Sequence, residues 1–281
     1  MSIPSAEIIL TEPAPRRAGN PVLGGVLTVI VALASSLFLL FIIAPVVGLV
    51  SAGGMRGLAS LSSDRELRSA LTLTAVTATV ATVLGVIGGT PIAYLLARRT
   101  FRGRSLLAAL LDLPVVIPHP VAGIALLLVL GRGTPVGGVL YAAGLRIAGS
   151  PTGIVCAMLF VSAPLYVSAA REAFARVNVR YEAVARTLGD TSWRAFRRVT
   201  LPLSLRGLTA AAVVMWARAV SEFGAIVILT YNPKVASVLS YDRFTGFGLN
   251  DALPVAAVLV LLALVPLAAL RALRVEPGRS S

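Results

Sequence analysis

Six long apolar runs divide this sequence, and they restrict its fold more than any other feature. An α-helix rises about 1.5 Å per residue, so about 20 apolar residues cross the ~30 Å hydrocarbon core of a bilayer. The runs lie near residues 22–50, 71–97, 105–131, 150–170, 205–230 and 252–273. Only 13% of all residues are charged, which excludes a soluble globular domain. We therefore expect an all-α membrane protein with six transmembrane helices.

The segments outside these runs are short and polar. Residues 1–20 are charged, and the apolar run after them is longer than the core of a cleaved signal peptide, which has about 7 to 15 residues. The first run therefore remains in the protein as a helix. We expect an N-terminal tail over 1–20, one transmembrane domain over 21–274 and a C-terminal tail over 275–281.

The basic residues are unevenly distributed between the two sides of the membrane. Of the 25 Lys and Arg residues, 17 fall in the tails and in the loops at 98–104 and 171–206, which six spans place on one side. By the positive-inside rule both termini and the long 172–204 loop are cytoplasmic. The net charge of +13 then reflects topology, so we expect membrane lipid and no nucleic acid as a partner.

Three prolines, Pro114, Pro118 and Pro120, interrupt the third run. Each removes a backbone donor and hinders the preceding turn, so a continuous helix is not expected. Broken backbone at membrane depth packs on protein or lines a wet cavity, which places this segment beside a polar pathway, with an ordinary kinked helix as the alternative. Asp112 either reaches the cytoplasmic interface or caps freed backbone, and the lone His119 is expected to pack or to make a backbone hydrogen bond rather than bind metal.

The 172–204 loop predicts two helices joined by a glycine turn. Apolar residues recur at helical spacing from Phe174 to Leu188, Gly189 follows at the expected stop, and Asp190 to Ser192 can cap a second helix. Such an insert is either a stiff lever for a partner protein or an amphipathic helix resting on lipid. Composition alone fits both interpretations.

The fifth run contains an ionisable pair. Arg218 and Glu222 are four residues apart, so on a helix they share a face and can neutralise each other inside the bilayer. A functional pair and a purely structural salt bridge both remain open.

The stretch from Tyr181 to Ser204 resembles the coupling motif of ABC-importer permeases. That motif is E-A-A, three residues, G, nine residues, I, one residue, L-P. Gly189, Val199, Leu201 and Pro202 keep its second half in register, and Val184 and Ala185 stand at the two alanine positions. Glu182 lies one residue before the motif's glutamate position, so the register of the motif does not by itself assign that glutamate's role to it. The resemblance favours the lever.

The fifth run narrows the resemblance. A-R-A-x-S-E-F-G-A resembles the oxyanion branch of these permeases, which handles sulfate, molybdate and tungstate. The following T-Y-N-P-K and V-L-x-Y-D-R-F look most like its tungstate/molybdate members. The resemblance covers about residues 22–273. It implies a type I ABC importer permease (MetI-like) architecture with a cytoplasmic coupling helix, in the cell membrane.

The resemblance also implies function and partners. The chain would be the permease subunit of an ATP-driven importer for tungstate/molybdate oxyanions. It would form the pore with a second copy of itself, and work with two cytoplasmic ABC ATPase subunits and an extracytoplasmic oxyanion-binding protein. A sulfate or thiosulfate permease is the alternative in the same class. An ion-gradient-driven carrier is the alternative from another class.

Two groups of residues are expected to carry this function. The residues that couple to the ATPase would be Glu182, Ala185, Arg186, Leu188, Gly189, Asp190, Leu201 and Pro202. The residues of the pore and its gate would be Asp112, Pro114, Pro118, Arg218, Ser221 and Glu222.

No catalytic centre is expected in this chain. The sequence has no G-x-x-x-x-G-K-[ST] phosphate loop, no nucleophile elbow and no H-E-x-x-H pair. One cysteine, Cys156, builds neither a disulfide nor a cysteine metal site. We therefore expect no enzyme activity and no bound metal or cofactor, with ATP and Mg²⁺ on the partner ATPase.

Overall fold

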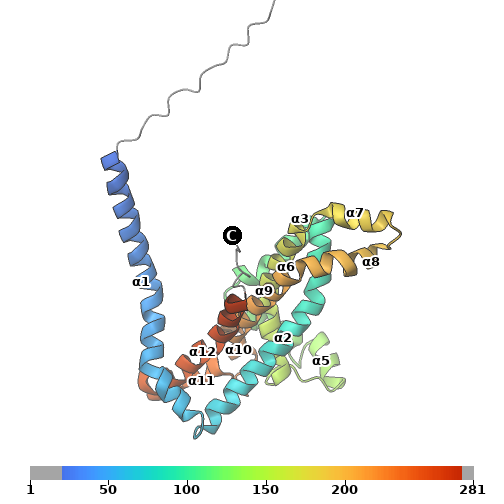
Figure 1. Ribbon diagram of the computed structural model, residues 1–281. Coiled ribbons are helices and arrows are strands. Elements are labelled where there is room, and N and C mark those ends of the chain that lie inside the picture. Colours follow the sequence, from blue (N-terminus) through green and yellow to red (C-terminus); the bar gives the residue numbers. More distant parts are fainter. Residues whose placement is uncertain (1–20, 274–281) are drawn as a thin grey trace, which may run out of the picture. The chain divides into compact units, whose positions relative to one another are not determined.

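The computed structural model describes residues 21–273, and every regular element within them is helical. The predicted tails at 1–20 and 275–281 lie outside the described residues. In chain order (Figure 1) the elements are α1 Pro21–Ser60, α2 Arg65–Arg98, α3 Arg104–Val116, α4 His119–Leu130, α5 Pro135–Ala142, α6 Pro151–Arg176, α7 Val179–Thr187, α8 Ser192–Ala195, the π-helical η1 Phe196–Thr200, α9 Leu201–Val220, α10 Gly224–Leu229, α11 Ala236–Phe247 and α12 Leu249–Leu273.

The chain forms two compact units. The first ends at Gly48 and contains, in its described part, the N-terminal portion of α1, a nearly continuous run of apolar residues. The second begins at Leu49 and holds the remaining elements. The architecture below is that of the second unit.

Membrane-spanning helices account for most of the described chain. Five helices are long and apolar enough to cross a bilayer, and α3 with α4 forms a sixth candidate whose halves are bent by 114°. This confirms the all-helical membrane architecture. It also confirms the predicted break in the third run, because α3 ends at Val116 and α4 begins beyond Ile117 and Pro118.

The core of the second unit is built from α2, α6 and α9. Small residues such as Ala81, Ala157 and Ala219 are fully buried there, which lets helix backbones approach closely without a hydrophobic driving force from water. Polar groups in this core are paired: the hydroxyls of Thr90 and Tyr166 lie 2.6 Å apart across the α2–α6 contact. The core therefore holds three long helices as one body.

The fifth span, expected near 205–230, contains a helix break that the sequence pattern did not predict. Helix α9 stops at Val220, and a short irregular stretch precedes α10. The break is held by hydrogen bonds to Glu222: its Oε1 accepts from the backbone N–H of Ala225 at 2.8 Å, and its carbonyl accepts from the Ser237 hydroxyl at 2.7 Å. These bonds replace the helical ones that are lost, as buried polar backbone requires.

A charged cluster joins α11 to the start of α2. Arg243 pairs with Asp64 at 2.7 Å and with Glu66 at 3.3 Å, and Lys234 lies 3.7 Å from Glu66 and bonds Asp242. Hydrogen bonds from Lys234 and from Tyr231 hold the pKa of the Asp242 carboxyl below its usual range. The cations of this cluster are thus neutralised locally.

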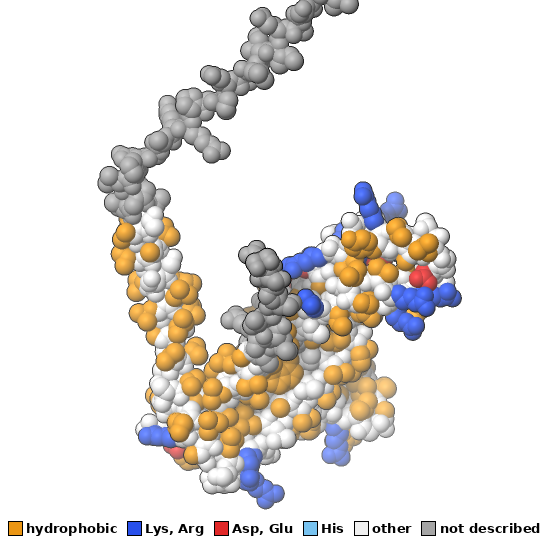
Figure 2. Space-filling view, viewed as in Figure 1, with side chains coloured by type: hydrophobic (Ala, Val, Ile, Leu, Met, Phe, Trp, Pro, Cys, Tyr) orange, Lys and Arg blue, Asp and Glu red, His pale blue; other side chains and the backbone are white. Residues whose placement is uncertain are grey.

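Helices α7 and α8 form a hairpin at one end of the second unit. Helix α6 has 26 residues and is therefore about 39 Å long. The hairpin follows its C-terminus, and the α5 segment precedes its N-terminus, so these two segments lie at opposite ends (Figure 1). Lys and Arg side chains gather around the hairpin, while hydrophobic side chains dominate the helices behind it (Figure 2).

Candidate functional site

The tip of the α7–α8 hairpin is a tight glycine turn. Gly189 has φ +97°, a conformation that other residues rarely adopt, and a Cβ placed there would meet nothing within 4 Å. The Asp190 N–H donates to the Ala185 carbonyl at 3.1 Å and closes the end of α7. Thr191 caps α8 by accepting from the Arg194 N–H. The predicted helix, glycine turn and helix are all present.

The hairpin exposes apolar side chains that nothing in the described chain covers. Leu188 is 84% exposed and Trp193 is 66% exposed, and Tyr181 and Val184 are also exposed. Exposed arginines surround them, as Figure 2 shows for this end of the molecule. A contiguous surface that is apolar and basic is typical of a site for another protein or for anionic lipid.

Glu182, in contrast, points into the protein. Its Oε1 lies 3.1 Å from Arg98 Nε and accepts from the Thr200 hydroxyl, and its Oε2 accepts from the Tyr94 hydroxyl at 3.1 Å. Arg98 also donates to the Val177 carbonyl at 2.8 Å. This glutamate therefore ties α7 to α2 and to η1, and it is a positioning residue rather than part of the exposed tip.

The eight expected coupling residues fall into two groups. Arg186, Leu188 and Gly189 are exposed at the tip. Asp190 lies in the same turn, and its carboxylate pairs with Arg198 at 3.4 Å. Glu182 and Ala185 are half-buried, and Leu201 and Pro202 begin α9, with Leu201 packed on the buried core.

Sequence reasoning missed the residues that anchor the hairpin. Tyr94 and Arg98 lie on α2, more than 80 positions before Glu182, and no motif spacing links them to it. In the sequence, Arg98 counted only as one of the basic residues that place the 98–104 loop on the cytoplasmic side. The single available signal was the end of an apolar run at a basic residue, which fits any cytoplasmic helix end.

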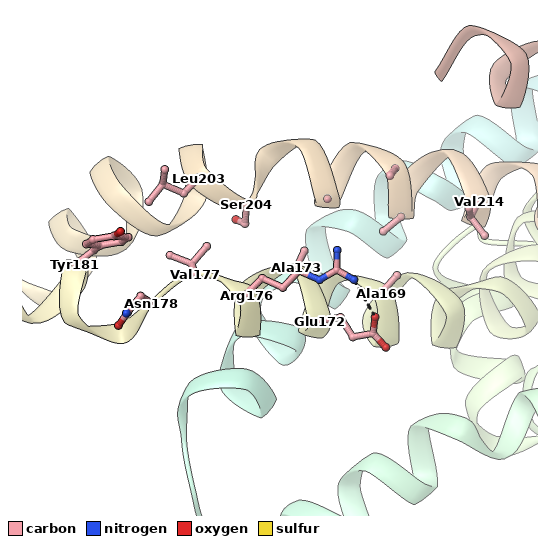
Figure 3. Close-up of a pocket in the computed structure, with 13 residues that line it drawn as sticks. Ala169, Glu172, Ala173, Arg176, Val177, Asn178, Tyr181, Leu203, Ser204 and Val214 are labelled. Carbon is pink, nitrogen blue, oxygen red and sulfur yellow. Dashed lines mark ion pairs between the residues drawn. The ribbon is translucent and has the colours of Figure 1, made fainter. Parts of the chain in front are cut away.

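An open groove of about 610 Å³ lies between the C-terminal half of α6 and the first half of α9. Figure 3 shows Tyr181 of α7 at one end of it and Val214 of α9 at the other, with the ion pair of Arg176 and Glu172 (3.8 Å) on its α6 side. Since Tyr181 belongs to the hairpin, a movement of α7 changes the shape of this groove.

The two broken spans meet at one point. His119, the first residue of α4, lies 3.2 Å from the Glu222 carboxylate, which also bonds Arg218 at 2.8 Å. Arg218 Nη2 is 2.9 Å from the imidazole Nε2. A Cβ on Gly224 would lie 2.6 Å from His119 Cβ, so only glycine lets α10 approach α4 this closely.

The basic side chains of this junction are partly exposed, whereas its carboxylate is buried. The Glu222 side chain is 1% exposed, whereas that of Arg218 is 24% exposed and that of His119 is 40% exposed. Ser221 is exposed beside them and donates to the Arg218 carbonyl at 3.0 Å. The predicted Arg218–Glu222 pairing is confirmed. His119 does more than pack, because its ring contacts both partners.

The remaining pore candidates lie apart from the pair. Asp112 is exposed on α3 and makes no side-chain hydrogen bond or ion pair within residues 21–273, so it caps nothing at the break there. Pro114 is buried within α3, and Pro118 precedes α4 as its N-cap residue. The prolines thus shape the break, and His119 is the residue that brings this segment to Arg218 and Glu222.

Metal-binding chemistry has no support among the residues described. No group of three His, Cys, Asp or Glu side chains that could hold an ion occurs there. Cys156 is a free, half-buried thiol.

Residues 89–275 match the protein family described as "Binding-protein-dependent transport system inner membrane component". A protein of Thermococcus kodakarensis named molybdate/tungstate transport system permease protein is 45% identical over 63% of this chain and 66% of its own length. A protein of the same name from Pyrococcus furiosus is 42% identical over 69% of this chain and 72% of its own length. The first of these matches therefore spans about two thirds of the relative.

Solved structures share the fold. A bacterial ABC transporter involved in import of the acidic polysaccharide alginate aligns with a TM-score of 0.65 at 18% identity, over 89% of this chain and 96% of its own. The inward-facing methionine ABC transporter aligns with a TM-score of 0.60 at 18% identity, over 74% of this chain and 94% of its own. At such identities the similarity concerns architecture alone.

Proposed function

Because this chain belongs to the family of binding-protein-dependent transport system inner membrane components, we propose that it is the permease subunit of an ATP-driven importer for molybdate and tungstate. Its architecture is that of a type I ABC importer permease. The observation that supports this substrate assignment is the 45% identity to a relative named as a molybdate/tungstate permease.

The hairpin is the part that receives mechanical work. Its tip offers Leu188 and Trp193 to a cytoplasmic ATPase subunit, and Gly189 leaves the turn free of side-chain bulk. Its base is fixed to α2 through Glu182 and Arg98. A push on the tip therefore moves α2 and α9 together instead of bending the hairpin alone.

Helix α9 carries this movement to the pore. It has 20 residues and is about 30 Å long. Its first residues belong to the hairpin base and its last turn holds Arg218. The junction of the two broken spans thus sits at the far end of a stiff rod driven by the ATPase.

The junction suits the passage of an oxyanion. A dianion in a low-dielectric pore needs donors that replace its hydration. Arg218 supplies partly exposed guanidinium donors, while the buried Glu222 lowers the net charge of the junction and opposes tight trapping. Two copies of the chain form the pore between them, and both termini are cytoplasmic, consistent with the basic residues at the hairpin end.

The two alternatives have weaker support. A sulfate permease would share the fold and the hairpin, but the relatives described above are named for molybdate and tungstate. A gradient-driven carrier has no use for an exposed tip held rigidly on its base. In the proposed importer, the external binding protein selects the anion before this subunit meets it.

Isothermal calorimetry on the external protein that binds this permease tests the substrate. We expect nanomolar-range binding of molybdate or tungstate and no measurable binding of sulfate, since a site built around the larger metalate contacts sulfate poorly. Tight sulfate binding without metalate binding would replace the proposal with its sulfate alternative.

A further inference from the structure

The segment between α4 and α6, residues 131–150, carries two arginines and no acidic residue. The nearest carboxylates along the chain are Asp112 and Glu172, one on each side, and neither belongs to this segment. Arg132 and Arg146 are exposed and form no ion pair within the described part of the chain. Their charges are therefore not balanced by a carboxylate of the described chain. The two arginines precede the N-terminus of α6, whereas the basic hairpin follows its C-terminus.

The two arginines share one aromatic ring. Arg132 Cζ stands 4.1 Å from the ring centroid of Tyr141, and Arg146 Cζ stands 5.8 Å from it. Both arginines and the ring line a pocket of about 230 Å³. Two like charges beside one ring add to a single positive potential, which a bound anion would offset. Paired guanidinium groups also match the oxygens of a tetrahedral oxyanion.

The backbone that holds the pocket is tightly hydrogen-bonded. The Thr134 hydroxyl accepts from the Gly137 N–H at 3.0 Å and lies 2.7 Å from the Val129 carbonyl, to which it donates. A Cβ on Gly137 would come within 2.0 Å of the Gly131 carbonyl oxygen, so this loop packs closely on itself. The arginines thus project from an ordered loop.

The cations of the α2–α11 cluster are arranged differently. Lys234 and Arg243 each have carboxylate partners within the chain. The segment that carries Arg132 and Arg146 instead exposes apolar residues, with Val136, Val139 and Leu145 each about half exposed or more. Such side chains are typical of a helix at the lipid boundary.

We propose that the pocket of Arg132, Tyr141 and Arg146 binds a tetrahedral oxyanion. Two sources supply this group on that side of the membrane: the phosphate of an anionic lipid headgroup, and a free metalate such as molybdate. The exposed Leu145, which lines the pocket, places lipid within reach of it. This inference requires only that the chain is a membrane protein, and it stands whichever anion is imported.

The test uses the purified full-length chain in nanodiscs and two probes. In one arm, discs of equimolar phosphatidylcholine and phosphatidylglycerol are analysed by native mass spectrometry for retained phosphatidylglycerol. In the other, discs of phosphatidylcholine alone are dialysed to equilibrium against inorganic molybdate. Each arm compares the wild type with the double variant Arg132→Gln/Arg146→Gln. The double variant Arg65→Gln/Arg68→Gln is the matched control, since it removes two exposed arginines elsewhere.

We expect binding in at least one arm that the Arg132→Gln/Arg146→Gln variant weakens by about tenfold or more and that the control leaves unchanged. Arg132→Lys/Arg146→Lys keeps both charges but loses the stacked planar forks, so it should bind with intermediate strength. If the glutamine variant folds poorly, the lysine variant replaces it in the comparison with the wild type. If the glutamine variant retains less phosphatidylglycerol than the wild type, the ligand of the pocket is the lipid headgroup. If it binds less molybdate, the ligand is the free anion. Absence of binding in both arms, or equal loss in the control, overturns the proposal.

Discussion

Gly189→Trp abolishes ATP-driven uptake and leaves the protein inserted in the membrane. The turn has φ +97° and open space around it, so the indole is accommodated in the isolated chain at the cost of backbone strain of about 1–3 kcal/mol. The same indole occupies the proposed docking surface for the ATPase, beside the exposed Leu188 and Trp193. Because steric exclusion at a docking point removes the whole contact, we expect uptake to fall by about a hundredfold or more.

Gly248→Trp is the matched control for this prediction. Gly248 also has a positive φ, +91°, and a Cβ at this position would meet nothing within 4 Å, but the residue follows α11 rather than belonging to the hairpin. Copurification of the ATPase subunits with each variant is the measurement. The Gly248 variant should retain the subunits and the Gly189 variant should lose them. Normal uptake by Gly189→Trp would show that the ATPase does not dock on this turn.

Arg218→Ala destabilises the protein more than Arg218→Ala combined with Glu222→Gln. The single change leaves a carboxylate that is 1% exposed without its guanidinium partner, and breaking a buried ion pair costs about 3–5 kcal/mol. Glutamine removes the stranded charge and keeps an oxygen for the Ala225 N–H, which Glu222 Oε1 accepts at 2.8 Å. We expect the double variant to lose only about 1–2 kcal/mol.

Denaturant titration in mixed micelles measures these free energies of unfolding. Arg206→Ala is the control, because Arg206 is an exposed arginine on the same helix and its removal should change the unfolding free energy by less than about 0.5 kcal/mol. Equal losses in the single and double variants, or losses that simply add, would show that Arg218 and Glu222 do not form an energetic pair.

Local sequence rules predicted the features that depend on neighbours in the chain. The prolines broke the third run because each lacks a donor, and Gly189 ended α7 because it tolerates a positive φ. The spacing of Arg218 and Glu222 predicted their contact because four residues make about one helical turn. These effects act within a few residues and need no knowledge of tertiary structure.

Other features depend on segments far apart and were not predictable in this way. The break after Val220 exists because Glu222 bonds Ala225 and Ser237 instead of continuing the helix. His119 joins that group only because α4 turns by 114° from α3. Glu182 was expected among the residues that couple to the ATPase, and its contact with Arg98 on α2, which no motif spacing indicates, fixes it at the base of the hairpin.

The proposed roles of the hairpin and of the junction together mean that movement of the tip would reach the anion pathway through α9. The central claim is therefore that this chain moves metalate only when an ATPase works on it. The direct measurement is uptake of molybdate into vesicles that contain this chain, its ATPase subunits and the external binding protein. Uptake that requires ATP and stops when the ATPase is omitted is the predicted result. Uptake by the chain alone, driven by an ion gradient without ATP, would contradict the account.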